Sequence, residues 1–384
     1  MKKLKITITV ISIIFAMIGI SPMVNATEYD KVMLDDLTSS EKYYIIGEKN
    51  SEFLVEHDID VEKLNLTTQV QKVLIDNKMS VKDYYKNIIN SVKEEAETYN
   101  LTDEQIENYI SALMQSPPIV GRNKDDAIKD MEKGNAAEIQ AENRPTDDGI
   151  GWEVKSLSAY SKASTFLTLP TIKNRTDKTA AYMFYTIGSN SSSWCMDFGL
   201  GYDEGGNIVK WRVFQVWNGS DFNAEEDMYE PFANIEIDAS NLYMKVEHLE
   251  GSNSGYVNFQ ILNGSNFNKV YVNYSYYVGD KGLYGTNTYF NKQVTLCNEA
   301  KNFLTGTQML NAKFNDSYIY STPNGITSKM LPSNCEDGQK VNGVYEPNHC
   351  GKFGTNSTNA KQVIKNSGNN WYEEDISVLF QSMQ

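Results

Sequence analysis

The residues best placed by type and spacing to do chemistry are two acids in residues 235–240, which read Ile-Glu-Ile-Asp-Ala-Ser. Alternation of apolar and polar residues predicts a β-strand, and on a strand Glu236, Asp238 and Ser240 point the same way. Two carboxylates on one face are suited to general acid and base catalysis. The alternative is an edge strand whose carboxylates are only solvated.

This motif resembles the active strand of sandwich glycosidases of the laminarinase type, which reads Glu-x-Asp-x-Glu. The resemblance implies that Glu236 is the nucleophile and Asp238 its supporting carboxylate. Retaining hydrolysis needs a second carboxyl group roughly 5 Å away as acid and base. Ser240 lies at that position in this chain, and a hydroxyl is a poor substitute. Asp227 or Glu230 are the acids that could replace it.

Aromatic residues form the second set of candidates. Sugar-binding proteins stack pyranose faces on exposed rings, and the chain has 5 Trp and 24 Tyr. The predicted ligand-binding residues are Trp194, Trp211, Trp217, Tyr271 and Tyr274. Because aromatic residues are also favoured in strands, packing in the core is the alternative for each.

The elements that must position these residues are short strands. From residue 151, runs rich in aromatic and β-branched residues alternate with Gly, Asn and Ser clusters, which indicates an antiparallel sandwich. Residues 243–248 and 256–262 predict a hairpin. Over residues 151–331 the chain resembles the concanavalin A-like lectin/glucanase sandwich and secreted bacterial proteins of the YrpD type. That resemblance implies a jelly-roll-like fold and secretion, and it assigns no site.

The rest of the chain divides into smaller parts. Residues 27–117 have helical periodicity, with a capping box at Thr102 and Gln105, and predict a small helical bundle. Residues 118–150 are charged and lack periodicity, so we expect a linker. Residues 332–384 are a polar C-terminal extension. The predicted fold class is therefore mainly β, a sandwich preceded by a helical module.

The N-terminus predicts export. Lys2, Lys3 and Lys5 precede an apolar stretch at residues 6–20, and Ala26 ends a small-x-small cleavage motif. An uncleaved membrane anchor is the alternative. The net charge is −15, and loss of the three signal lysines makes the mature chain more acidic still. This charge argues against binding to nucleic acid or anionic lipid. We expect a secreted, extracellular protein.

An exported chain with four cysteines predicts two disulfides, and the favoured pairs are Cys195–Cys297 and Cys335–Cys350. The three histidines form no metal or triad pattern, so we expect no cofactor. The alternative is a calcium site at the acidic run Asp221, Asn223, Glu225, Glu226 and Asp227.

Together these observations favour a non-catalytic protein that binds an extracellular glycan or another cell-surface polymer. The first alternative is an enzyme like the glycoside hydrolases that acts on an extracellular polysaccharide. The second is a protein–protein interaction module that uses the helical half. The oligomeric state stays open.

Overall fold

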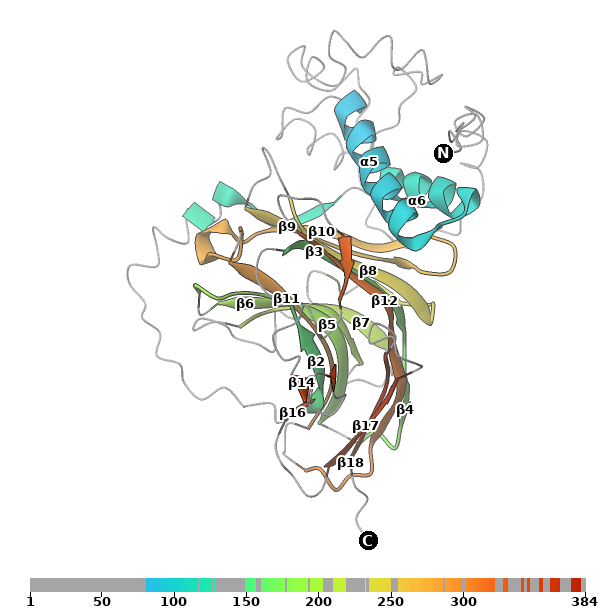
Figure 1. Cartoon of the computed structure of the whole chain (residues 1–384), viewed down its shortest axis with the longest axis vertical. Coiled ribbons are helices and arrows are strands. Elements are labelled where there is room, and N and C mark those ends of the chain that lie inside the picture. The colour runs from blue at the N-terminus through green and yellow to red at the C-terminus, as the bar shows by residue number, and fades with distance from the viewer. Residues whose placement is uncertain are drawn as a thin grey trace. The chain divides into compact units, whose positions relative to one another are not determined.

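The computed structural model describes most of residues 81–128 and 149–330, with short gaps, and the strand residues between 340 and 380. The chain forms two compact units: residues 1–119 with 266–270, and residues 120–265 with 271–384. Figure 1 shows the helices and strands of the described residues and labels many of them. The described residues form a mainly β fold with helices α5 and α6 toward the N-terminus, as the sequence predicts.

The first unit contains helices α5 (Val81–Tyr99) and α6 (Asp103–Gln115). Thr102 caps α6: its hydroxyl accepts from the Gln105 backbone N–H at 3.2 Å, and the Gln105 side chain accepts from the Thr102 backbone. The predicted capping box is therefore confirmed. The ring of Tyr109 packs on Phe267 with centroids 4.9 Å apart. Among the described residues, no helix is long and apolar enough to cross a membrane.

The second unit is a sandwich of two large antiparallel sheets and one small one. The six-stranded sheet has the order β16-β2-β11-β5-β6-β7. Its strands are β16 (Lys352–Gly354), β2 (Gly149–Lys155), β11 (Thr288–Asn298), β5 (Thr179–Ser189), β6 (Cys195–Tyr202) and β7 (Trp211–Asn218).

The ten-stranded sheet follows the order β1-β10-β9-β8-β3-β12-β18-β17, with β4 and β13 also paired to β12. These strands are β1 (Ile119–Arg122), β10 (Val270–Tyr277), β9 (Tyr256–Asn263), β8 (Asn241–His248), β3 (Tyr160–Thr168), β12 (Gln308–Ser321), β18 (Glu374–Phe380), β17 (Ala360–Asn366), β4 (Thr171–Lys173) and β13 (Thr327–Lys329). The predicted hairpin is β8–β9, paired from Leu242 opposite Asn263 to His248 opposite Val257. β14 (Lys340–Val341) and β15 (Val344–Tyr345) pair separately.

The C-terminal extension is part of both large sheets. β18 pairs with β12 and with β17, and β16 pairs with β2. Ile376 and Val378 of β18 are fully buried in the core. The sandwich therefore reaches Phe380, well beyond the expected boundary at residue 331.

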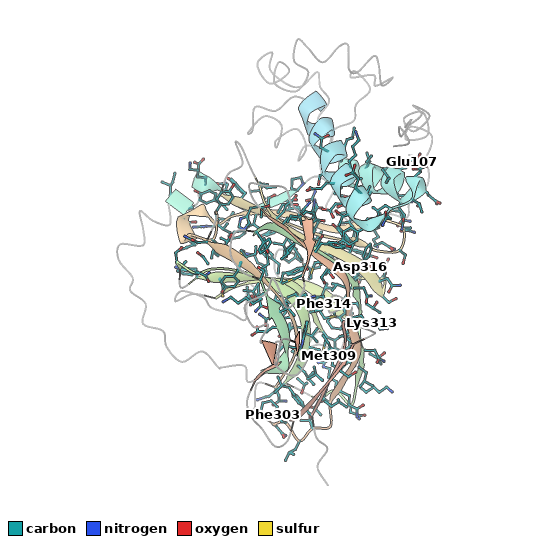
Figure 2. The ribbon with its side chains drawn as sticks, in the orientation of Figure 1. Glu107, Phe303, Met309, Lys313, Phe314 and Asp316 are labelled. Atoms are coloured by element: carbon teal, nitrogen blue, oxygen red, sulfur yellow. The ribbon has the colours of Figure 1, made fainter. Side chains whose placement is uncertain are left out.

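The core lies between the two large sheets. Alternate residues of the regular stretches point inward, and β12 interrupts this alternation at a register shift between Met309 and Ala312. On β12, Met309 and Phe314 are buried in the core while the neighbouring Lys313 is half-buried (Figure 2). One inward position is a lysine: Lys292 of β11 is fully buried, and its Nζ donates to Ser317 Oγ at 2.9 Å. The rings of Trp152 and Phe314 lie 5.7 and 5.5 Å from this Nζ, so the cation rests between aromatic faces.

Candidate active site

Residues 235–240 lie on irregular backbone and not on a strand, so the expected active strand is wrong. Their alternation nevertheless orients the side chains: Ile235, Ile237 and Ala239 pack against the core, and the residues between them are exposed. The side chain of Glu236 is 75% exposed and accepts from Lys210 Nζ at 2.6 Å. Asp238 accepts a hydrogen bond from the Tyr271 hydroxyl. Asp227 and Glu230 lie outside the described residues. The catalytic roles of Glu236 and Asp238 stay predictions.

The aromatic candidates are mostly in the core. Trp211, Tyr271 and Tyr274 are 8%, 7% and 1% exposed, which fits the packing alternative and leaves no open ring face. Burial raises the pKa of the Tyr271 hydroxyl far above its ordinary value, and the bond to Asp238 raises it further. Trp194 is half-buried beneath Lys281, whose Nζ is 4.2 Å from the ring centroid. The Trp217 side chain lies outside the described residues.

The predicted Cys195–Cys297 disulfide is wrong. Cys195 lies opposite Gly188 of β5, and Cys297 lies opposite Ala180 of the same strand. These positions are separated by about 26 Å at the usual rise of a strand, whereas the Cα atoms of a disulfide are roughly 4.4–6.8 Å apart. Cys335 and Cys350 lie outside the described residues.

The structure instead brings polar side chains together on the outward face of the six-stranded sheet, the face turned away from the core. Met183, Tyr185 and Ile187 of β5 point into the core, so Thr186 between them points outward. The registers align Thr186 with Asp197 of β6 and with Asn291 of β11. In Figure 1 both large sheets bend, and this face lies on the inside of the bend. The outward polar cluster comprises Glu153, Thr186, Asp197, Asn291, Gln293 and Thr295.

Three members of this cluster form a hydrogen-bonded chain across three neighbouring strands. Thr186 Oγ1 donates to Asp197 Oδ1 at 2.6 Å, and Gln293 Nε2 donates to Thr186 Oγ1 at 3.0 Å. A hydroxyl has a single proton, and that proton is used on Asp197. The Thr186 hydroxyl therefore cannot also donate to Gln293, and the Gln293 amide is fixed with its nitrogen toward Thr186.

A second pair lies beside this chain. Asn291 Nδ2 donates to Glu153 Oε2 at 2.6 Å, which fixes the orientation of the Asn291 amide. Asn291 and Thr295 are 7% and 6% exposed. The Asn291 Oδ1 and Thr295 Oγ1 atoms have no hydrogen-bond partner in the described structure. Buried polar atoms are normally paired, so these two are candidates to contact a ligand.

An aromatic cluster adjoins the polar cluster on the same face. Phe214 of β7 makes edge contacts with Tyr182 and Phe184 of β5, at centroid distances of 5.3 and 5.7 Å. Gly199, which follows Asp197 by two residues, lies opposite Phe184. A Cβ on Gly199 would meet the Phe184 Cβ at 2.3 Å and the Met183 carbonyl oxygen at 2.4 Å. Glycine therefore lets β5 and β6 approach closely next to Asp197.

Sequence reasoning missed this cluster. The local signal is the run Asn291, Gln293 and Thr295, three polar residues at alternate positions of one strand. Asp197 and Gln293 are far apart in sequence and meet only through the order β6-β5-β11. No local pattern gives that order.

The described residues bring together no group of three or more His, Cys, Asp or Glu side chains that could hold a metal ion. The acidic run proposed as a calcium alternative, residues 221–227, lies outside the described part of the chain.

The fold and the site together define an antiparallel β-sandwich protein. On one face of its six-stranded sheet, a carboxylate, a hydroxyl and a carboxamide are linked by hydrogen bonds. No protein-family model and no curated protein matches the sequence. Solved structures of similar fold include scytalido-glutamic peptidase with a peptide-based transition state analog, at 12% identity and a TM-score of 0.36 over 61% of this chain and 98% of that chain. Another is SCP-B, a member of the eqolisin family of peptidases in complex with the tripeptide Ala-Ile-His. It has 11% identity and a TM-score of 0.34, over 62% of this chain and 99% of that chain.

At these identities the likeness concerns the fold alone. The sandwich that the sequence predicts is consistent with it. The similar structures are peptidases. The interpretation of this chain as a non-catalytic glycan-binding protein is corrected and is not carried further. The burial of Trp211, Tyr271 and Tyr274 points in the same direction, because buried rings offer no stacking platform.

Proposed function

We propose that the chain is a hydrolase that cleaves an amide bond by direct attack of water, with Asp197 as the general base. The hydrogen-bonded chain from Gln293 through Thr186 to Asp197 carries this proposal. The hydroxyl of Thr186 orients Asp197 by donating to it. In its ionised form, Asp197 would accept a proton from water.

The proposed reaction uses groups already oriented by the sheet. Asp197 takes a proton from water as the water oxygen adds to the substrate carbonyl carbon. The carbonyl oxygen then gains negative charge, which fixed hydrogen-bond donors stabilise. The Gln293 amide has two N–H groups and uses one on Thr186, so the second is available to this oxygen. Asp197 then passes the proton taken from water to the amide nitrogen, the C–N bond breaks, and the products leave as a carboxylic acid and an amine. No covalent intermediate with the protein is needed.

The spacing of the carboxylates favours this chemistry over glycoside hydrolysis. Asp197 and Glu153 lie on β6 and β2, which are three strand spacings apart in the sheet order. Three spacings amount to about 14 Å, whereas the two carboxyl groups of glycosidases are roughly 5–9.5 Å apart. Hydrolysis of an acyl bond needs only one carboxylate as base.

We also propose that the enzyme acts outside the cell. The supporting observation is the order of basic residues, apolar stretch and small residues over residues 2–26. A substrate in that compartment is a protein or peptide in the surroundings.

The test is hydrolysis of a mixture of unfolded proteins by the purified chain, with the new amino termini identified by mass spectrometry. We expect Asp197→Asn to lower turnover by at least about 100-fold, the lower end of the effect of a general base. Glu236→Gln is the matched control and should retain activity within about twofold, since Glu236 is a solvated partner of Lys210. Full activity of Asp197→Asn would refute the proposal. Release of reducing ends from polysaccharides, with no cleavage of protein, would replace it with glycoside hydrolysis.

A further inference from the structure

The ends of the two large sheets differ in how they are protected. Exposed strand edges invite pairing with another chain, and proteins usually keep them short or place lysines on them. Among the described strands, β16 has three residues and includes Lys352, and β1 has four. β17 is longer, but it carries Lys361 and Lys365. These three edges are therefore guarded against strand addition.

The fourth edge strand, β7, lacks these features. It has eight residues, Trp-Arg-Val-Phe-Gln-Val-Trp-Asn, and all eight pair with β6 without a bulge. Arg212 is its single charged residue, and it contains neither proline nor glycine. In the sheet order β7 has a described neighbour on one side only. A long and regular strand at an edge presents a row of backbone donors and acceptors to a further strand.

Gln215 of β7 supplies a second, independent observation. It lies opposite the core residue Phe198, and its side chain therefore points between the sheets. The residue is 7% exposed, and its Oε1 atom has no hydrogen-bond partner in the described structure. A buried carbonyl without a donor is unfavourable. The neighbour that completes this edge should therefore bring an N–H group to Gln215.

We infer that the β7 strands of two copies of this chain pair antiparallel about a two-fold axis at Gln215. Such a pairing keeps the core faces of both copies on the same side, because residues directly opposite each other share a face. Opposite side chains have Cβ atoms about 5 Å apart. Each Gln215 Nε2 then donates to the Oε1 of the other copy. The dimer joins the two six-stranded sheets through one continuous ladder.

The register avoids repulsion between like charges. With Gln215 at the axis, Arg212 lies opposite Asn218 of the other copy, Val213 opposite Trp217, and Phe214 opposite Val216. The Arg212 side chains of the two copies therefore do not lie opposite each other. The partner that fits this edge is the chain's own sequence.

The test is sedimentation velocity of the mature chain across a range of concentrations, together with amide hydrogen exchange. We expect a dimer, and slower exchange for residues 211–218 as the concentration rises. Gln215→Glu places two carboxylates opposite each other at the axis and should weaken the dimer by roughly 100-fold. Gln215→Met is the matched uncharged control and should weaken it by about tenfold at most. Circular dichroism verifies that each variant is folded.

A chain that stays monomeric at all concentrations would overturn the inference. A dimer whose exchange over residues 211–218 is independent of concentration would also overturn it, because the interface would then lie elsewhere. If Gln215→Glu does not fold, the exchange measurement on the unaltered chain decides the question alone. None of these outcomes depends on whether the protein is a hydrolase.

Discussion

Residues 235–240 and the outward polar cluster each contain two acids whose side chains point away from the core, and their surroundings differ. Glu236 is 75% exposed and forms an ion pair with the flexible side chain of Lys210. Asp197 accepts from Thr186 on the next strand, which accepts in turn from Gln293 on the strand beyond. Alternation determines the side on which a residue lies, and the neighbouring strands determine its partners. The partners held by neighbouring strands, rather than the acids themselves, therefore identify a candidate site.

Among substitutions that keep every polar group, we expect Gly199→Ala to lower the free energy of unfolding the most. The added methyl group would overlap the backbone and Cβ of β5 beside Asp197. We expect a loss of about 3 kcal/mol in the free energy of unfolding, because the two strands must separate. Denaturant unfolding measures this loss. An alanine variant as stable as the unaltered chain would mean that the sheet next to the site is less tightly held than we describe.

His248 offers a contrasting polar group that is buried without a network. The rings of Tyr284 and Phe290 pack against it, and neither imidazole nitrogen has a hydrogen-bond partner in the described structure. Burial lowers its pKa to about 4. As the pH falls below about 6.5, His248 binds a proton in the unfolded chain before it does so in the folded protein. The free energy of unfolding therefore decreases from about pH 6.5 down to about pH 4.

Between pH 7 and pH 4, we expect the protonation of His248 to lower the free energy of unfolding by about 3 kcal/mol. His248→Leu should remove this part of the acid destabilisation. The measurement is denaturant unfolding of both proteins at the two pH values. Parallel losses in the two proteins would contradict the low pKa.

Thr186→Val tests whether the cluster acts through its connections. Valine has the same shape and lacks the hydroxyl, so it leaves Asp197 in place and removes the link to Gln293. We expect turnover of protein substrate to fall by about 10- to 100-fold, equivalent to one hydrogen bond to a charged group. Unchanged turnover would show that Thr186 only packs in the sheet.

The smallest expected effect belongs to the exposed pair. Lys210→Met removes the contact with Glu236, whose side chain is largely in water. We expect the free energy of unfolding to change by at most about 0.5 kcal/mol. Thermal unfolding in low salt checks this value. A loss several times larger would mean that residues 235–240 are held as firmly as the outward polar cluster.

Local features of the fold could be predicted from the sequence. The β8–β9 hairpin follows from alternation around a Gly-rich turn, and the capping box follows from the spacing of Thr102 and Gln105. Long-range features could not. The addition of β18 to the ten-stranded sheet and the meeting of Asp197 with Thr186 depend on strand order. The Cys195–Cys297 disulfide failed for the same reason, because two cysteines in one sheet can lie at opposite ends of its strands. The concanavalin A-like resemblance and the exported location stay predictions.

The most direct test of the account compares Asp197→Asn with Glu236→Gln on the same unfolded protein substrate. Each change replaces a carboxylate with a carboxamide of the same shape, one inside the hydrogen-bonded chain and one in water. The account predicts that the first variant loses at least about 100-fold in turnover and the second keeps full activity. Loss of activity in Glu236→Gln, with full activity in Asp197→Asn, would contradict it.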